Sequence, residues 1–317
     1  MTIDEICKKL YSYDSYLIFC HCRPDGDTVG SALALKKAFE RMGKRADVVC
    51  ASPVPAKFGL FRETSEILPV DKVTGEYSAH VAVDCSTENM IGDAYPLFKK
   101  SKNTFNIDHH VSNERYAAYN LVVDSAANAE NMYNVIGRSG IEIDKEIADR
   151  LLLGISTDTG NFMHANVTAN TLRTASELVS LGGDLHTIAC EMFKNQTRAR
   201  AELFAKVISG MRFFSDGRVA LITITKNDLA EFNATQDLTE GFIDFPLSVR
   251  GVEVAVSVLE SKENCYKISL RSKGKVNVNE VASQFGGGGH ILASGCMISG
   301  FYEDVKDKLL RVINFQL

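Results

Sequence analysis

The sequence has no tryptophan, only 6 prolines, and no apolar run near the roughly 18 residues that cross a membrane. Its eight cysteines form no CxxC pair, so no disulfide framework is indicated and free thiols in a reducing cytoplasm are expected. The N-terminus carries acids early and lacks a small-residue cleavage site, so we expect no secretion signal. Positive charge is not in excess either. With 35 Lys and Arg against 40 Asp and Glu, the formal net charge of −5 argues against coating long or duplex nucleic acid.

The 317 residues are 45% apolar and 24% charged, which is typical of a globular protein and excludes disorder or a fibrous repeat. This length favours two domains, each able to bury a core. In the first half, short apolar runs alternate with helical patterns, as parallel β/α units do. Strands are predicted at 15–22, 46–50, 79–84 and 104–107, and helices at 28–42, 129–138, 144–155 and 168–181.

The second half of the sequence has a different pattern of apolar and polar residues. Segments 218–225, 251–260 and 264–271 alternate apolar and polar residues as half-buried strands do, and helices are predicted at 277–285 and 302–313. The sequence therefore predicts an α/β protein with an N-terminal parallel-sheet domain over 1–188 and a helical linker over 189–212. A smaller α+β domain follows over 213–317, with the active-site cleft between the two domains.

Three candidate metal ligands follow the first predicted strand in the stretch HCRPDGD, namely His21, Asp25 and Asp27. Ligands gather at the carboxyl ends of strands in open α/β sheets, so this position suits a site. An uncompensated buried carboxylate is costly, and a divalent ion would offset that cost. The alternative is an exposed turn in which Asp27 or Thr28 only caps the next helix.

Three further stretches place polar residues at the ends of core elements. They contain Asp84 after an apolar strand, Asp108-His109-His110 after another, and Asp158 in a turn bracketed by glycines. Taken singly, Asp84 is also explained by a turn and Asp158 by the end of a helix, whereas Asp-His-His at a strand end favours a site over a structural histidine. Together, four Asp and two His make a ligand set for two divalent ions. Oxygen and imidazole without thiolate suit Mn²⁺ or Mg²⁺ better than structural zinc.

A fifth stretch, GGGGH at 286–290, follows the helix predicted at 277–285, and the strand before that helix ends near Arg271 and Ser272. Four glycines cost backbone entropy, and they allow N–H groups to line up around an anion. The guanidinium of Arg271 can hold a phosphate through two hydrogen bonds. The alternatives are a flexible loop and a solvated edge charge.

Together these motifs resemble the DHH phosphoesterase family, named for the triplet seen here at 108–110. HCRPDGD, VAVDCS, NIDHHVSN and GISTDTGNF follow the family's order, and GGGGHILASG resembles its DHH-associated C-terminal domain. The match covers nearly the whole chain and is nearest to the nanoRNase and 3′-phosphoadenosine 5′-phosphate phosphatase group. Ser294 departs from the alanine of many relatives. The resemblance implies a Mn²⁺-dependent phosphoesterase that hydrolyses short oligoribonucleotides to mononucleotides, and 3′-phosphoadenosine 5′-phosphate to AMP and phosphate.

The resemblance also implies a role for each motif residue. His21 and Asp25 would hold one ion, Asp27, His109 and Asp158 the other, and Asp84 would bridge them. Asp108 would orient neighbouring ligands, and His110 would face the scissile phosphate. A terminal phosphate or nucleotide would be gripped by Arg271, Ser272, Gly287, Gly288, Gly289 and His290, with Asn113 and Arg115 as weaker candidates. Two such ions can bridge a hydroxide that attacks the phosphorus in line.

Several alternatives stay open from the sequence. A cyclic di-AMP or pApA phosphodiesterase uses the same architecture, and a catalytically silent nucleotide sensor is the alternative from another class. The length and acidity disfavour a RecJ-like exonuclease, and a family pyrophosphatase would lack GGGGH. Short single-stranded RNA and phosphorylated nucleotides are the expected partners, with no duplex DNA and no membrane. The polarity of degradation and the oligomeric state, including a homodimer, are undetermined.

Overall fold

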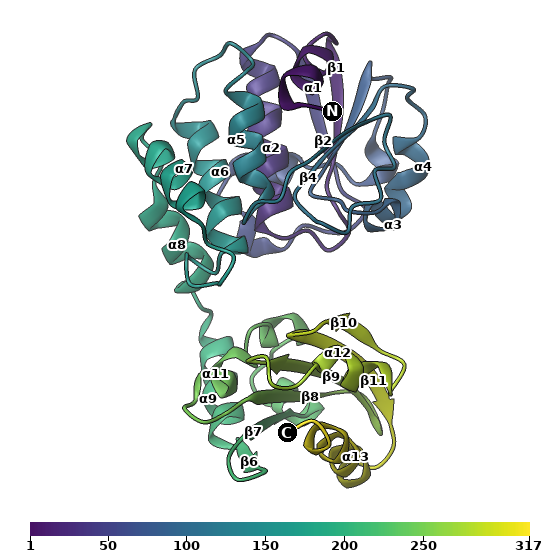
Figure 1. The fold of residues 1–317 in the computed structure, drawn as a ribbon, viewed down its shortest axis with the longest axis vertical. Coiled ribbons are helices and arrows are strands. Elements are labelled where there is room, and N and C mark those ends of the chain that lie inside the picture. Colours follow the sequence, from purple (N-terminus) through teal and green to yellow (C-terminus); the bar gives the residue numbers. More distant parts are fainter. The chain divides into compact units, whose positions relative to one another are not determined.

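A computed structural model describes residues 1–317, which divide into two compact units at 1–195 and 196–317 (Figure 1). The division falls inside the segment predicted as a linker. Helix α8 (Leu185–Phe193) belongs to the first unit and helix α9 (Arg198–Ser209) to the second. None of the helices is both long enough and apolar enough to cross a membrane.

The first unit is built on a parallel five-stranded sheet in the order β2-β1-β3-β4-β5. Its strands are β1 (Ser15–Phe19), β2 (Arg45–Val49), β3 (Ala79–Val83), β4 (Thr104–Asp108) and β5 (Tyr119–Val122). All residues of β3 and β4 are buried, including the polar His80, Asn106 and Asp108, because both faces of this parallel sheet are covered. The edge strand β5 is partly exposed and was not predicted.

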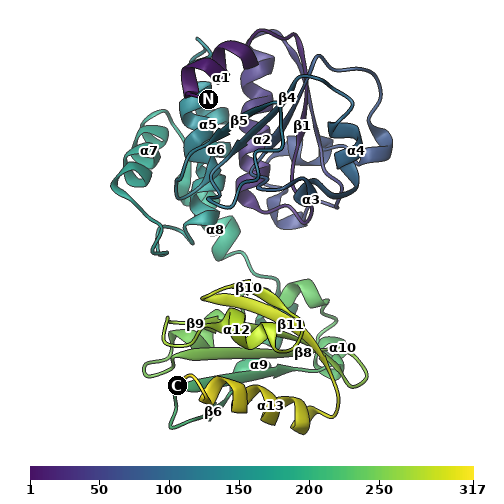
Figure 2. The same cartoon turned by 45° about the vertical axis from the view of Figure 1, so that its right-hand side comes forward.

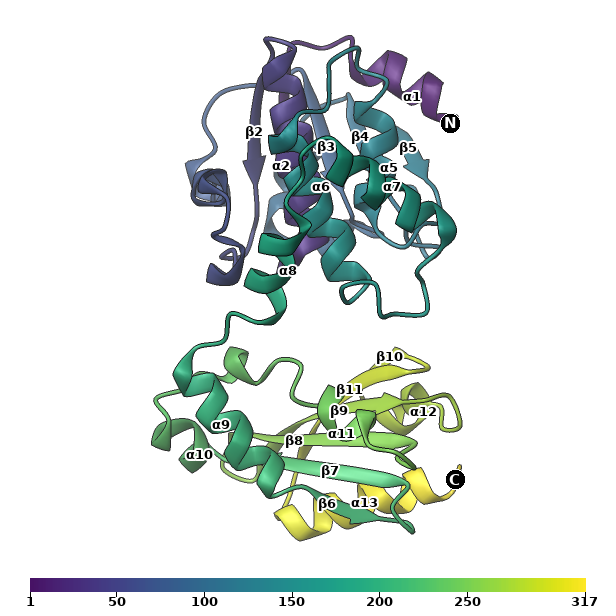
Figure 3. The ribbon, with the colours of Figure 1, turned by 90° about the vertical axis from the view of Figure 1, so that its left-hand side faces the viewer.

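Helices cover both faces of this sheet (Figure 1), and Figure 3 looks onto one of the two covered faces. Tyr16 and Ile18 point into the larger core, and Leu17 and Phe19 into the smaller one. The larger core is closed mainly by α1 (Ile3–Leu10), α2 (Gly26–Arg41), α5 (Asn128–Ile136), α6 (Lys145–Asp158) and α8, and the smaller by α3 (Glu88–Ile91) and α4 (Tyr95–Phe98). Helix α7 (Ala169–Ser180) packs against α6.

Helices α2 and α6 approach each other closely because glycines line their contact. A Cβ atom at Gly30 would lie 2.3 Å from the carbonyl oxygen of Arg150, and one at Gly154 would lie 2.5 Å from a carboxylate oxygen of Asp27. The start of α2 differs from the expected cap. Asp25 is the N-cap, and its side chain accepts hydrogen bonds from the amides of Asp27 and Thr28.

The second unit contains a six-stranded sheet in the order β10-β11-β9-β8-β7-β6, antiparallel except between β7 and β8 (Figure 2). Its strands are β6 (Arg212–Phe214), β7 (Val219–Ile224), β8 (Val254–Lys262), β9 (Cys265–Ser272), β10 (Gly288–His290) and β11 (Ala293–Ser299). Helices α12 (Val278–Ser283) and α13 (Tyr302–Asn314) cover one core, and α9, α10 (Lys226–Glu231) and α11 (Asp244–Ser248) lie by the other.

The glycine-rich stretch is not a loop throughout. Residues Gly288–His290 form the edge strand β10, which turns through two residues into β11. A Cβ atom at Gly287 would lie 2.2 Å from the carbonyl oxygen of Gly295, and Gly289 has φ +144°. Close approach and backbone conformation therefore both require glycine here.

Candidate metal centre

The predicted ligands converge at one edge of the first sheet. His21 follows β1, Asp84 follows β3, and His109 follows β4, and the carboxyl ends of parallel strands share an edge. The first turn of α2 supplies Asp27, and the last residue of α6 is Asp158. The close packing of α2 on α6 explains why two carboxylates distant in the sequence reach the same place.

Two groups of ligand atoms form there, each with all atoms within 4.8 Å of one another. One consists of His21, Asp25 and Asp84, and the other of Asp27, His109 and Asp158. Asp84 faces both groups. One of its oxygens lies 3.7 Å from Nε2 of His21, and the other lies 3.3 Å from Nε2 of His109. This placement suits a carboxylate shared by two ions.

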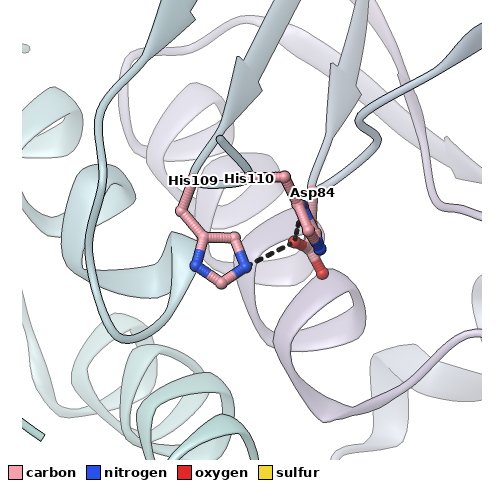
Figure 4. Close-up of side chains that lie close together, drawn as sticks. All are labelled: Asp84, His109 and His110. Atoms are coloured by element: carbon pink, nitrogen blue, oxygen red, sulfur yellow. Dashed lines mark ion pairs between the residues drawn. The ribbon is translucent and has the colours of Figure 1, made fainter. Parts of the chain in front are cut away.

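His110 joins Asp84 and His109 in a third group (Figure 4). Its Nδ1 lies 3.7 Å from Asp84 Oδ1 and 2.8 Å from Asp108 Oδ1. Its side chain is 37% exposed, whereas that of His109 is 13% exposed. The two adjacent histidines therefore differ, with His109 inside the ligand cluster and His110 at its open side.

Backbone carbonyls orient the two candidate histidine ligands in the same way. Nδ1 of His21 lies 2.9 Å from the carbonyl oxygen of Cys22, and Nδ1 of His109 lies 2.9 Å from that of Ser125. A carbonyl oxygen only accepts, so Nδ1 carries the proton in each hydrogen bond. In the neutral ring this leaves the lone pair of Nε2 directed at the carboxylates, as metal ligation requires.

The carboxylates repel one another in the metal-free protein. Burial raises the pKa of Asp27 to about 6, although His109 opposes that shift. Burial, followed by the charges of Asp27 and Asp25, raises the pKa of Asp158 to about 9. Burial and Asp27 also raise the pKa of Asp84 well above its ordinary value. Burial disfavours charge on His109, yet Asp84 and Asp27 raise its pKa to about 10. The excess of carboxylates therefore raises all four of these pKa values, and bound cations would offset their negative charge.

Asp84 also provides direct evidence that the residues fit a cation. It is 2% exposed, and its Oδ1 is buried without a hydrogen-bond partner. Its backbone has φ +58°, a conformation that costs energy for a residue other than glycine. A buried acceptor without a donor is rare in native proteins, and a divalent ion would satisfy it. The donor set of carboxylates and imidazoles fits such an ion.

Asp27 is fully buried and is held by backbone groups from distant residues. Its carboxylate accepts hydrogen bonds from the amides of Asn128 and Ala129, at the start of α5, and from the hydroxyl of Ser31. These donors hold the carboxylate of Asp27 so that it faces His109 and Asp158. The local sequence around Asp27 gives no indication of them.

Asp108 lies outside all three ligand groups. One of its oxygens accepts from His110, and the other accepts from the side-chain amide of Asn113 at 2.6 Å. The same amide of Asn113 donates to Asn106 at 2.7 Å. Asn113 and Asn106 thus belong to the network that orients His110. The sequence left Asn113 a weak candidate and missed Asn106, which stands two residues before Asp108.

The predicted phosphate-binding residues lie in the second unit. Arg271 of β9 pairs with Ala293 of β11, which pairs with His290 of β10, so the three occupy one row. Directly paired residues share a face of a sheet, and the small alanine leaves space between the two candidate phosphate-binding residues. Ser272 is buried, and its hydroxyl accepts from the amide of Gly274.

The chain belongs to the DHH family. The model of the DHH family, N-terminal domain, matches residues 15–155, and that of the DHHA1 domain matches residues 216–317. Enzymes of this family use divalent metals, and the ligand groups described above can hold one.

Individual relatives match over most of their length. The chain is 31% identical to the bifunctional oligoribonuclease and PAP phosphatase NrnA of Thermus thermophilus, over 95% of this chain and 89% of the relative. It is 25% identical to the protein of the same name from Bacillus subtilis, covering 96% of each. A solved exopolyphosphatase-related protein from Bacteroides fragilis superposes with a TM-score of 0.91 at 28% identity, covering 99% of this chain and 97% of that one.

Proposed function

We propose that this protein is a two-metal hydrolase that converts short oligoribonucleotides to mononucleotides and 3′-phosphoadenosine 5′-phosphate to AMP and phosphate. The observation that carries the proposal is the pair of adjacent ligand groups, with Asp84 in the first group and 3.3 Å from His109 of the second, and with a buried oxygen of Asp84 that has no donor. The names of the Thermus and Bacillus relatives supply the substrate class. A silent sensor is disfavoured because all six predicted ligands are present and gathered at one sheet edge.

The chain's own residues divide the chemistry between them. His21, Asp25 and Asp84 would hold one ion, and Asp27, His109 and Asp158 the other, with Asp84 shared. Two such metal ions, when bound, would supply Lewis-acid stabilisation of the phosphoryl group and would activate a water molecule. His110, held through Nδ1 by Asp108, presents Nε2 toward the open side and can donate a proton to the leaving oxygen. Arg271, His290 and the glycine strand would grip a terminal phosphate.

We further propose Mn²⁺ as the ion, since carboxylates with imidazoles suit it well, with Mg²⁺ as the alternative. The reducing cytoplasm is the proposed location, which suits eight cysteines that are all free thiols.

The deciding experiment uses the purified full chain, stripped with a chelator and reloaded with Mn²⁺ or Mg²⁺. The substrates are 3′-phosphoadenosine 5′-phosphate, RNA of two to several nucleotides, pApA and cyclic di-AMP. We expect metal-dependent release of phosphate from the first and of mononucleotides from short RNA. Preferential hydrolysis of cyclic di-AMP would replace the proposed substrate class, and tight nucleotide binding without hydrolysis of any of the four would favour the sensor.

A further inference from the structure

A cavity of about 530 Å³ opens beside the ligand cluster and has no role in the chemistry above. It is lined by His21, Cys22, Arg23, Asn89 and Met90. Its size is within the range of small-molecule sites. Because His21 also belongs to the first ligand group, a molecule in this cavity would lie directly beside the candidate metal pair.

Hydrogen bonds between two chain segments fix the walls of the cavity. The amide of Cys22 donates to the carbonyl oxygen of Met90 at 2.6 Å, and its thiol donates to that of Ile91 at 3.6 Å. The hydroxyl of Ser86 donates to the sulfur of Met90 at 3.1 Å. Gly92 has φ +60°, and a Cβ there would lie 2.1 Å from the sulfur of Cys22. The cavity is therefore preformed, and Gly92 makes the close approach possible.

The chemistry of the walls selects a flat, polar-edged ligand. Two polarizable sulfur atoms, from Cys22 and Met90, suit the face of an aromatic ring. The exposed amide of Asn89 offers both a donor and an acceptor. Arg23 is the one permanent cation and no carboxylate lines the cavity, in contrast to the adjacent ligand cluster. Arg23 also has φ +55°, so the turn holds this residue in a strained conformation.

We propose that this cavity is a nucleoside subsite, which binds the base and ribose attached to the phosphate that lies at the metal pair. The inference rests on the proposed function, and it adds Met90 and Asn89 as base-contacting residues and Arg23 as a cation facing the nucleotide. A free phosphate would engage the metal centre alone. A nucleotide would also fill the cavity, so the base would contribute affinity of its own.

The test compares the binding of AMP and ribose 5-phosphate to the full chain loaded with Mn²⁺, measured by isothermal titration calorimetry. The two ligands share phosphate and ribose and differ in the base. We expect AMP to bind about tenfold tighter than ribose 5-phosphate in the wild type, the order of one well-packed base. Met90→Ala should reduce this ratio of affinities about fivefold, because the loss of one sulfur–ring contact weakens binding by a factor of this size. Asn89→Ala should also reduce it.

The matched control is Met42→Ala, because Met42 is also half-buried but lies at the opposite end of α2, about 24 Å from its first turn. Its ratio should equal that of the wild type. The rise in Tm on adding Mn²⁺ is measured for every variant, and an unchanged rise indicates an intact metal pair. Should Met90→Ala lose that rise, Asn89→Ala decides the question, since its side chain is exposed.

A wild-type ratio near one, or a ratio unchanged by Asn89→Ala, would overturn the subsite. The result is separable from the proposed function, because binding is measured without turnover. If the protein hydrolyses none of the four substrates but Asn89→Ala lowers the base-dependent affinity, the subsite proposal stands and the proposed function fails. If the protein hydrolyses short RNA but Asn89→Ala leaves the ratio of AMP to ribose 5-phosphate affinity unchanged, the proposed function stands and the subsite proposal fails.

Discussion

At the scale of single residues, Asp84 combines three features that are unfavourable without a bound cation. It is buried, its backbone has φ +58°, and one of its oxygens has no donor. Its neighbours in space are Asp27, Asp25 and Asp158, which raise its pKa after burial itself. We therefore expect Asp84 to destabilise the fold when no cation is bound and to stabilise it when cations are bound.

Asp84→Asn should lower hydrolysis by about 10³-fold or more, because the shared ligand is lost. The Tm of the metal-free variant should equal or exceed that of the wild type, since an amide removes charge repulsion and asparagine tolerates positive φ better. The measurement is Tm with and without Mn²⁺, beside a phosphate-release assay. An undiminished rise in Tm with Mn²⁺ would remove Asp84 from the metal site.

The Asp108→Asn substitution should disturb the orientation of His110 without affecting the binding of the metal ions. Asp108 contacts His110 and Asn113 and belongs to no ligand group, so the Mn²⁺-dependent rise in Tm should persist. The kcat should fall about 10²-fold, within the range of a lost proton donor. His110→Ala should cause a similar loss, and the double variant little more, because both remove the same oriented imidazole. Additive losses would contradict this pairing.

The stability of the metal-free protein should fall as pH rises from about 5 to 9. Asp27 and Asp158 have pKa values of about 6 and about 9 against an ordinary 3.8, so the folded state holds more protons in this window. His109 acts in the same direction, because its stabilising charge is complete below its ordinary 6.5 and is lost towards a pKa of about 10.

The measurement is Tm against pH in a chelator, with Asp158→Asn as the control that should flatten the slope. Added Mn²⁺ should reverse the trend, since its ligands bind in their deprotonated form. A metal-free Tm that rises over this range would contradict the described electrostatics.

At the scale of elements, the contact between α2 and α6 sets the geometry of the second ligand group. Asp27 opens one helix, Asp158 ends the other, and Gly154 lies where the two backbones approach. The amides at the start of α5 complete this arrangement by binding the carboxylate of Asp27. Three helices therefore determine one ligand position.

Gly154→Ala should destabilise the protein by about 1–3 kcal/mol, because the added methyl overpacks the helix contact. Its Cβ would lie 2.5 Å from Asp27 Oδ1 and 2.7 Å from Ala129 Cβ, so affinity for Mn²⁺ should fall too. Denaturant unfolding and metal titration measure the two effects. Gly210→Ala is the control, since its nearest atom would be 3.5 Å away. Equal effects of the two substitutions would contradict the role of Gly154.

At the scale of the whole molecule, the two units carry different parts of the proposed chemistry. All six candidate ligands lie in the first unit, and Arg271 and His290 lie in the second, each unit having its own cores. The net charge of −5 includes four of the proposed ligands. Two divalent ions would therefore offset most of the negative charge.

Arg271→Ala should raise KM for the 5′-phosphorylated dinucleotide pApA about tenfold while changing kcat less, because it removes a phosphate contact distant in sequence from the metal ligands. The KM for unphosphorylated ApA should not change. Lys267→Ala is the matched control, an exposed cation on the same strand. Equal effects on pApA and ApA would remove Arg271 from terminal-phosphate binding.

Much of the fold was predictable because the patterns are local. Strands β1 to β3 consist mainly of apolar residues, and helices α2, α6 and α7 have clear periodicity. Strand β11 was missed because Gly295 and exposed Met297 interrupt its alternation. The edge strand β10 was missed because glycine has no β-sheet preference, and its pairing with β11 alone makes it a strand.

The kinds of ligand, their order along the chain and the two-part organisation follow from the amino-acid sequence alone, since residue chemistry and periodicity are local properties. The folded chain was needed to show that Asp84 faces both groups, that amides 101 and 102 residues away hold Asp27, and that Asn113 reaches Asp108. It also revealed the cavity beside His21. These features depend on the packing of distant segments, which no local pattern of residues encodes.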